Sequence, residues 1–296
     1  MKTGFIAIVG RPNVGKSTLL NALLGEKIAI VSKKPQTTRN RITGILTKGE
    51  SQFVFMDTPG MHKAKTKLGN YMVKAISGTI GQVDAAFLVA DASYPPGETE
   101  LALIERLKKT ELPTILVLSK IDTAGAVKLA ECIEQYKDLM DYISVVPICA
   151  PQGRGVDVLL DEAEALLHED DWLFDADALT DQPEKQLAAE IIREKLLRLL
   201  DDEIPHGVAV VMEEFKEAKG LLSIRAEIFC ERESHKRIII GKGGAMLKKV
   251  GQYAREDLEA FFGEKIFLDL WVKVKENWRD SDFMVSNMGY NKKDLD

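Results

Sequence analysis

The sequence contains few cysteines and no long apolar run. Its three cysteines, Cys132, Cys149 and Cys230, lie far apart and form no C-x-x-C pair, which argues against zinc binding, redox chemistry and a disulfide framework. The apolar stretch at residues 5–9 is too short for a signal-peptide core, and no other segment approaches the length that spans a membrane. We therefore expect reduced thiols and a cytoplasmic protein.

The chain also lacks an excess of basic residues. Its 40 lysines and arginines face 46 aspartates and glutamates, a net charge of -6, which excludes a uniformly basic nucleic-acid-binding protein but not a local basic face. Hydrophobic residues make up 45% and charged residues 29% of the sequence, so the chain is expected to fold rather than to be disordered. At roughly 150 residues per domain, a chain of 296 residues predicts two domains.

Short apolar runs alternate with amphipathic stretches up to about residue 167. The expected strands cover residues 5–9, 53–56, 85–90, 115–118 and 145–148, and the expected helices include residues 16–24, 98–110 and 156–167. This alternation predicts an α/β domain with a mainly parallel sheet and helices on both faces. A ligand of such a domain binds at the carboxyl ends of the strands.

An acidic segment separates this region from a second one. Residues 168–181 contain six aspartates and glutamates, the composition of a linker that packs little. We therefore expect a first domain at residues 1–168, a linker at 169–182 and a second domain at 183–296. In the second domain Pro183 marks a helix start, and strands are expected at 208–212, 222–229 and 266–274. A glycine-broken pair of helices before the last strand completes a smaller α+β domain.

Residues 10–17 spell G-R-P-N-V-G-K-S, the complete G-x-x-x-x-G-K-[ST] pattern, between an expected strand and an expected helix. Its glycines let backbone N–H groups converge on phosphates, Lys16 places a positive charge near the β and γ phosphates, and the Ser17 hydroxyl can bind Mg²⁺. A glycine turn with an incidental lysine is the less favoured alternative. The predicted nucleotide contacts here are Gly10, Arg11, Pro12, Asn13, Val14, Gly15, Lys16, Ser17 and Thr18.

Two further segments complete a predicted magnesium site. The Asp57 carboxylate, at the end of an expected strand, can hold Mg²⁺ through water, and Gly60 offers an N–H group to a γ-phosphate. The loop P-Q-T-T-R at 35–39 contains two threonines, of which we favour Thr38 over Thr37 as the residue that binds Mg²⁺ when γ-phosphate is present. The predicted Mg²⁺ ligands are Ser17, Thr38 and Asp57, and the predicted nucleotide contacts of the strand end are Asp57, Thr58, Pro59, Gly60 and Met61.

The segment Ser119-Lys120-Ile121-Asp122 follows another expected strand. The Asp122 carboxylate can accept two hydrogen bonds from guanine that adenine cannot donate, so the segment predicts GTP rather than ATP. These three motifs, in this order, resemble those of the translation-factor-related GTPases, whose base-reading motif is N-K-x-D. Ser119 replaces that asparagine, so we expect a weaker brace to the phosphate loop. The resemblance also gives Cys149-Ala150 the place of the S-A pair that meets the guanine oxygen.

The same resemblance bears on the rate of hydrolysis. Met61 stands where many GTPases carry a glutamine that orients water, which implies slow intrinsic hydrolysis supported by other groups. In relatives with the same phosphate loop, the asparagine that matches Asn13 can bind a K⁺ ion, so we expect stimulation by K⁺. His62 is better explained as a solvated loop residue than as a base. The predicted catalytic residues are Lys16, Thr38, Asn13 and Gly60.

The second region contains a G-x-x-G loop between two expected helices. Basic residues surround this loop, and over residues 232–249 only Glu233 opposes them. Such a loop lets a sugar-phosphate backbone approach closely, which is how KH domains bind single-stranded RNA. A plain turn on a solvated helix face is the alternative. The predicted RNA contacts are Lys236, Arg237, Gly241, Lys242, Gly243, Gly244, Lys248 and Lys249.

A P-loop GTPase domain followed by a type II KH domain, in which a helix precedes the first two strands, resembles the Era-like subfamily of GTPases. The resemblance rests on residues 10–17, 36–39, 57–60, 238–244 and 271–275. It implies GTP and GDP as ligands, binding to small-subunit (16S) ribosomal RNA near its 3′ end, and assistance in maturing the small ribosomal subunit. It also implies peripheral contact with the inner face of the cell membrane. We expect that contact to be weak, because the sequence has no lipidation motif and no long basic amphipathic helix.

We expect a monomer, and two other functions stay open. Met61, Ser119 and Cys149 would suit a non-enzymatic RNA-binding adaptor with a decayed nucleotide site, although Lys16 and Asp122 argue against it. The third possibility is a signalling GTPase whose KH-like domain binds protein or lipid instead of RNA.

Overall fold

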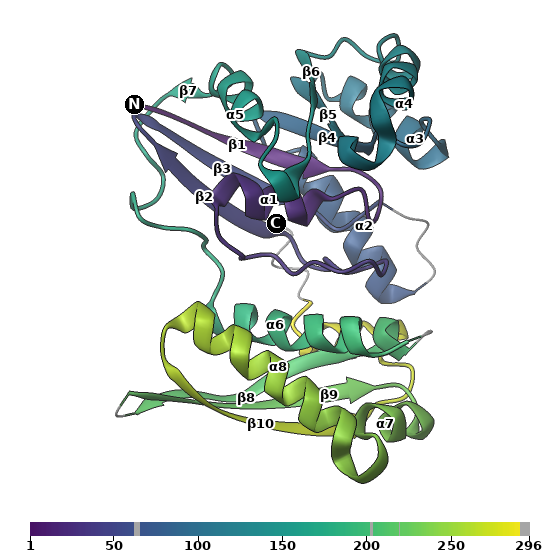
Figure 1. The fold of residues 1–296 in the computed structure, drawn as a ribbon, viewed down its shortest axis with the longest axis vertical. Helices are drawn as coiled ribbons and strands as arrows, with labels where there is room; N and C mark the ends of the chain where they lie inside the picture. The colour runs from purple at the N-terminus through teal and green to yellow at the C-terminus, as the bar shows by residue number, and fades with distance from the viewer. Residues whose placement is uncertain (62–65, 202–203, 219, 291–296) are drawn as a thin grey trace.

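The computed structural model describes residues 1–61, 66–201, 204–218 and 220–290. These residues form two bodies, one above the other in Figure 1, joined by a segment that descends along one side. The first domain is the upper body and the second domain is the lower one. Within the described residues, no helix is both long enough and apolar enough to span a bilayer.

The described part of the first domain is built on a seven-stranded sheet. Its strands are β1 (Lys2–Val9), β2 (Ile42–Lys48), β3 (Ser51–Asp57), β4 (Ala85–Asp91), β5 (Thr114–Ser119), β6 (Ser144–Pro147) and β7 (His168–Glu169). The order is β2-β3-β1-β4-β5-β6, with β7 paired to β1. Only β2 and β7 run antiparallel to their described neighbours, so the predicted mainly parallel sheet is confirmed.

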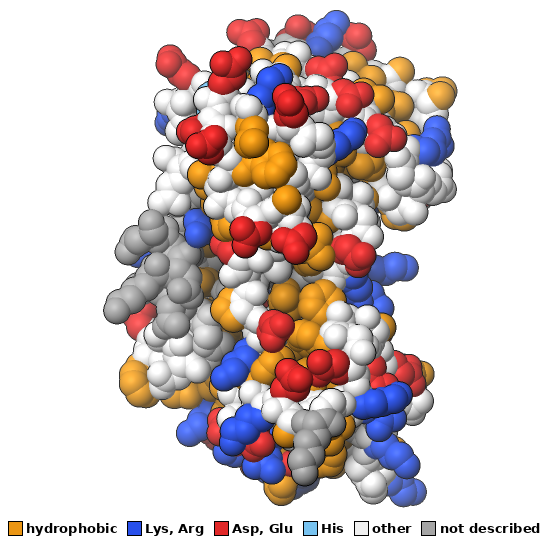
Figure 2. All heavy atoms as spheres, turned by 90° about the vertical axis from the view of Figure 1, so that its left-hand side faces the viewer, with side chains coloured by type: hydrophobic (Ala, Val, Ile, Leu, Met, Phe, Trp, Pro, Cys, Tyr) orange, Lys and Arg blue, Asp and Glu red, His pale blue; other side chains and the backbone are white. Residues whose placement is uncertain are grey.

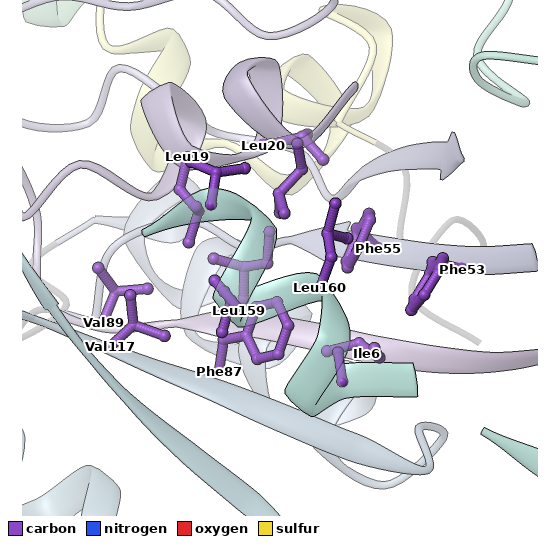
Figure 3. Packing of buried hydrophobic residues seen from close by; sticks show 14 of the residues in the cluster. Ile6, Leu19, Leu20, Phe53, Phe55, Phe87, Val89, Val117, Leu159 and Leu160 are labelled. Carbon is purple, nitrogen blue, oxygen red and sulfur yellow. The ribbon is translucent and has the colours of Figure 1, made fainter. Parts of the chain in front are cut away.

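Helices cover both faces of this sheet. They are α1 (Lys16–Leu24), α2 (Lys67–Ile80), α3 (Glu98–Lys109), α4 (Ile121–Tyr136) and α5 (Val156–Glu164). Because successive side chains of a strand point to opposite faces, Ile6 packs toward α1 and α5 while Ala7 packs toward α2, α3 and α4. Figure 3 shows the first of these layers, in which Phe87 of β4 lies beneath Leu159 of α5. Both faces are buried, which explains the near-continuous apolar runs of the central strands.

The second domain is an α+β body. Its elements are α6 (Glu184–Leu199), β8 (Ala209–Ala218), β9 (Leu221–Cys230), α7 (Glu233–Ile240), α8 (Ala245–Phe262) and β10 (Lys265–Val274). The sheet order is β10-β9-β8, with β8 antiparallel and β10 parallel to β9. One face of the sheet is covered by α6 and α8, and α6 lies on the side that faces the first domain (Figure 1). This order of elements is that of the predicted type II KH domain.

The acidic segment between the domains packs more than its composition suggests. The side-chain oxygen of Gln52 accepts hydrogen bonds from the backbone N–H groups of Leu173 (2.9 Å) and Phe174 (3.0 Å). Trp172 donates its Nε1–H to the carbonyl oxygen of Glu50 at 3.2 Å, so it anchors the segment to the first domain. Most residues of the segment are nonetheless exposed, as expected of a linker, and the domain boundaries stay a prediction.

The chain after β10 returns to the first domain. A 3₁₀ helix, η4 (Trp278–Asp280), and a short helix, α9 (Asp282–Asn287), follow β10. Trp278 and Tyr290 are buried in one apolar cluster with Leu68 and Tyr71 of α2. Sequence periodicity did not predict this packing, because the segment is short and its apolar residues are widely spaced.

Candidate functional site

The phosphate loop between β1 and α1 holds Lys16 inside the protein. The Nζ atom of Lys16 donates hydrogen bonds to the carbonyl oxygens of Gly10 (3.1 Å) and Arg11 (2.9 Å). Because the side chain is buried, desolvation lowers the pKa of Lys16 to about 8, and the nearby Asp57 carboxylate opposes this shift. The first N–H groups of α1 face the same loop, so the site is built to receive a negatively charged group.

Ser17, Thr38 and Asp57 meet at one point, although they come from α1, the following loop and β3. The Ser17 Oγ atom lies 2.7 Å from Thr38 Oγ1 and donates to Asp57 Oδ2 at 2.6 Å. The other carboxylate oxygen, Asp57 Oδ1, is buried and has no hydrogen-bond partner among the described residues. Burial raises the pKa of Asp57 to about 6, against the effect of Lys16. Two hydroxyls and an unsatisfied carboxylate oxygen fit Mg²⁺, which prefers oxygen ligands.

The loop between α1 and β2 places its two threonines in different environments. Residues 31–39 of this loop are called switch I below. Thr37 donates its hydroxyl hydrogen to the carbonyl oxygen of Lys34 at 2.6 Å, whereas Thr38 faces Ser17. Asn13 of the phosphate loop donates its Nδ2–H to the carbonyl oxygen of Lys33 at 2.9 Å. The Asn13 amide therefore ties the phosphate loop to switch I.

The segment after β3 passes directly beside the phosphate loop. A Cβ atom at Gly60 would lie only 2.6 Å from the Cα atom of Pro12, so only glycine fits here. The backbone N–H of Met61 donates to the carbonyl oxygen of Gly10 at 3.2 Å. The Met61 side chain packs against the apolar layer of α2, α3 and α4, and His62 lies outside the described residues.

Ser119, at the end of β5, contacts the phosphate loop. Its Oγ atom donates to the carbonyl oxygen of Val14 at 2.6 Å. The neighbouring Lys120 donates from Nζ to the carbonyl oxygen of Asn13 (2.7 Å) and to Asp91 Oδ2 (2.8 Å). The sequence predicts a weaker brace at Ser119, but the structure shows that the serine hydroxyl, though shorter than an asparagine side chain, reaches the loop.

Asp122 and Cys149 lie together at the carboxyl ends of β5 and β6. Burial raises the pKa of the Cys149 thiol, and a hydrogen bond with Asp122 adds to this effect. The Cys149 backbone exchanges hydrogen bonds with that of Arg154, at 3.0 and 3.2 Å. These bonds fix the loop that carries Ala150. The two segments that the sequence assigns to base recognition are therefore neighbours in space.

A cavity of about 880 Å³ opens over the phosphate loop and switch I. Of the predicted nucleotide contacts, Pro12, Asn13, Gly15, Lys16, Ser17, Thr18, Gly60 and Lys120 line it. Those that do not line it are Gly10, Arg11, Val14, Asp57, Thr58, Pro59, Met61, Ser119, Ile121, Asp122, Cys149 and Ala150. The predicted magnesium ligand Thr38 also lines the cavity. Unexpectedly, α6 of the second domain contributes Leu197 and Arg198 to its wall.

The G-x-x-G loop lies between α7 and α8, at the end of the second domain away from the first (Figure 1). Gly241 has φ 75°, and a Cβ atom there would lie 2.8 Å from Met246 N, so the turn needs glycine. Arg237, Lys242, Lys248 and Lys249 are exposed, while Lys236 is half-buried and Gly241, Gly243 and Gly244 shape the loop. Figure 2 shows lysines and arginines gathered on the lower part of the molecule, which is the second domain.

Arg39 connects the two domains and was missed as a functional candidate. Its side chain is 1% exposed. It donates to the carbonyl oxygens of Val208 (2.7 Å) and His206 (2.9 Å) and to the Tyr290 hydroxyl (3.1 Å). The only sequence signal was its place in the P-Q-T-T-R loop, and none of its described partners lies nearby in sequence.

The fold and the site define a P-loop GTPase joined to a KH domain. Residues 5–120 match the family described as "50S ribosome-binding GTPase", and residues 203–279 match the KH domain. The chain is 51% identical to GTPase Era of Ruminiclostridium cellulolyticum, over 98% of this chain and 97% of that protein. It is 49% identical to GTPase Era of Clostridium botulinum strain Kyoto, over 98% and 99% of the two chains. The chain therefore belongs to the Era family of GTPases.

Solved structures agree with this assignment. An Aquifex aeolicus Era variant bound to GDP and AlF₄⁻ superposes with a TM-score of 0.94 at 39% identity, covering 98% of this chain and 99% of that one. Era in complex with MgGDPNP and nucleotides 1506–1542 of 16S ribosomal RNA gives a TM-score of 0.93 at 38% identity, with the same coverage. The predicted GTPase activity and two-domain architecture are confirmed.

Proposed function

We propose that this GTPase binds small-subunit ribosomal RNA near its 3′ end and assists assembly and maturation of the small ribosomal subunit. The observation that carries the proposal is the G-x-x-G loop of the KH domain, with Lys242, Lys248 and Lys249 exposed beside it. The relative solved with nucleotides 1506–1542 of 16S ribosomal RNA supports this RNA as the partner. That complex favours the small subunit over the 50S subunit that the family description of residues 5–120 mentions.

We also propose roles for the residues of the nucleotide site. Lys16 and the N–H groups of residues 10–17 contact the β and γ phosphates, and the Gly60 N–H meets the γ phosphate. The buried cation and the close approach of Gly60 to Pro12 support this arrangement. Asp122, beside Cys149 and Ala150, selects guanine. Since Met61 packs against an apolar layer, its side chain does not orient the attacking water, which supports slow intrinsic hydrolysis.

Ser17, Thr38 and Asp57 are the residues that we propose hold Mg²⁺. Their short mutual distances and the unsatisfied Asp57 Oδ1 support this assignment. The Thr37 hydroxyl is bonded to the carbonyl oxygen of Lys34 instead, which supports Thr38 as the ligand. When bound, Mg²⁺ would offset negative charge on the phosphate oxygens. The related structure with MgGDPNP contains this ion.

We propose K⁺ as a further activating ion. The Asn13 amide nitrogen donates to the Lys33 carbonyl oxygen in switch I. The amide oxygen of Asn13 is not used in that bond, and we propose it as the K⁺ ligand. Charge that develops in the transition state would be stabilised by such an ion. Equal hydrolysis rates in NaCl and KCl would remove this part of the proposal. The cytoplasmic location, weak peripheral membrane contact and monomeric state stay predictions from the sequence.

The first test is GTP turnover by the purified full-length chain in KCl, with and without single-stranded RNA from the 3′ end of small-subunit ribosomal RNA. We expect slow turnover that RNA accelerates, together with RNA binding that depends on the bound nucleotide. An RNA that binds without changing turnover would contradict coupling of the two activities. Absence of RNA binding would contradict the proposed partner, and absence of turnover in every condition would favour the adaptor alternative.

A further inference from the structure

The second domain holds switch I through its helix α6. The Glu194 carboxylate accepts a hydrogen bond from the Val31 backbone N–H at 3.0 Å, and Arg198 donates to the Val31 carbonyl oxygen at 3.1 Å. Further along switch I, Arg193 donates from Nη2 to the carbonyl oxygen of Thr37. These bonds connect residues more than 150 positions apart in the sequence, so they depend on how the two domains dock.

A second contact holds switch I on the other side of Thr38. The Arg39 guanidinium donates to two carbonyl oxygens of the second domain, those of His206 and Val208. It also lies over the rings of Trp278 and Tyr290, with 5.9 Å from Cζ to each centroid. Thr38 therefore sits between two neighbours that are each fixed to the KH domain.

Separating Arg39 and Arg193 from their acceptors costs free energy. Arg39 and Arg193 are each 1% exposed, so their charges are removed from water and depend on the acceptors that the structure supplies. Arg193 also pairs with Glu190, at 2.8 Å from Nε and 2.5 Å from Nη2. A shift of switch I away from α6 would leave at least one buried N–H group of Arg193 without its carbonyl partner. Switch I is therefore held in place rather than free to drift.

We infer that Arg193 and Arg39 are positioning residues for GTP hydrolysis, which act by placing Thr38 against Ser17 and Asp57. This inference rests on the proposed role of Thr38 as an Mg²⁺ ligand. It makes part of the RNA-binding domain a component of the GTPase site. A change in domain docking would then alter hydrolysis through the position of one threonine, without any contact between RNA and nucleotide.

The test compares full-length Thr38→Ala, Arg193→Gln and the double variant in GTP hydrolysis at varied Mg²⁺. Loss of one charge-assisted hydrogen bond is expected to lower kcat by about tenfold in Arg193→Gln. The Mg²⁺ concentration for half-maximal rate should rise as well, while GDP affinity stays within about twofold because GDP binding does not use Thr38. In the Thr38→Ala background, Arg193→Gln should have no further effect. Lys185→Gln, at an exposed position of the same helix, is the matched control.

Two results would overturn the inference in distinguishable ways. If Thr38→Ala lowers hydrolysis but Arg193→Gln leaves both kcat and the Mg²⁺ dependence unchanged, the positioning role is wrong and the Mg²⁺ role of Thr38 survives. If Thr38→Ala has no effect, both ideas fail. Should Arg193→Gln not fold, Arg39→Lys provides the same comparison, because lysine keeps the charge but cannot bond both carbonyl oxygens in the same geometry.

Discussion

The nucleotide site and the proposed RNA face, which is the surface of Lys242, Lys248 and Lys249, are built in opposite ways. In the nucleotide site Lys16 is 6% exposed and Asp57 is fully buried, and each is bonded to neighbouring groups before any ligand is considered. On the RNA face Lys242, Lys248 and Lys249 extend into solvent from a glycine-rich turn. The first site is preorganised from buried groups, whereas the second is an open array of charge.

This difference predicts different physical behaviour. Buried polar groups have fixed partners, so a single change at a group that binds the ligand directly should cause a large loss that salt hardly screens. Exposed charges act additively on a polyanion, so each change should be modest and strongly dependent on salt. Variants on the two surfaces therefore test whether the sites differ in this way.

The largest effect is expected at Asp122. Replacing Asp122 by asparagine removes the carboxylate that we propose accepts two guanine hydrogen bonds. The loss of two charge-assisted bonds predicts a loss of GTP affinity of about 10³-fold. The carboxamide matches xanthine, whose ring carries an acceptor where guanine carries an amino donor. Isothermal titration with GTP and with xanthosine triphosphate would measure the exchange of specificity. A loss of affinity for both nucleotides alike would argue that Asp122 supports the fold rather than the base.

Charge reversal on the RNA face should have the next largest effect. The test variant carries Lys242→Glu, Lys248→Glu and Lys249→Glu. Each lost phosphate contact reduces the steepness of the plot of log K against log salt by roughly 0.7, so the three together reduce it by about 2. At 0.1 M salt this corresponds to about 10²-fold weaker binding of single-stranded RNA. Filter binding over a salt series would measure both quantities. Lys185→Glu is a suitable exposed control, and an unchanged slope in the triple variant would place the RNA elsewhere.

The fold followed closely from the sequence where local signals are strong. The helix expected at residues 16–24 has those bounds in the structure, because a glycine turn starts it and Gly25 ends it. Strands β4 and β5 were found because buried parallel strands are continuous apolar runs. The path of the acidic segment along β3 was not predictable, since its bonds to Gln52 depend on a strand that is more than 100 residues away.

The candidate site divides in the same way. Each motif of the nucleotide site is a contiguous stretch of sequence. Roles for Lys16, Ser17 and Asp57 could therefore be predicted from the spacing of these motifs. The contribution of the second domain could not, because Arg193 lies on an ordinary amphipathic helix and reaches switch I only after the domains dock. Local chemistry is visible in a sequence, while contacts between domains require the assembled structure.

The protonation of Lys16 gives a third comparison between the two sites. Lys16 is buried, whereas the lysines beside the G-x-x-G loop are exposed. In the nucleotide-free protein the pKa of Lys16 is about 8, so the ammonium group loses its proton as the pH rises through that value. Bound phosphates favour the charged form, and GTP affinity should therefore fall about tenfold between pH 7 and pH 9, with proton uptake on binding. Calorimetry in two buffers of different ionisation enthalpy would detect the uptake. Lys16→Arg, whose guanidinium stays charged, should not show this fall.

The smallest effect is expected at Ser119, and it tests how finely the nucleotide site is preorganised. Its hydroxyl donates to the carbonyl oxygen of Val14 at 2.6 Å, deep beneath the phosphate loop. Ser119→Ala removes this brace and leaves the Val14 carbonyl unsatisfied, a loss of about 1 kcal/mol that corresponds to roughly fivefold weaker GTP and GDP binding. Ser119→Cys restores a weak donor of larger size. Its nucleotide affinity should lie between those of Ser119→Ala and the unmodified protein. If Ser119→Ala binds both nucleotides as tightly as the unmodified protein, the contact of Lys120 with Asn13 is sufficient at this corner of the loop, and the preorganisation assigned to the corner rests on one contact rather than two.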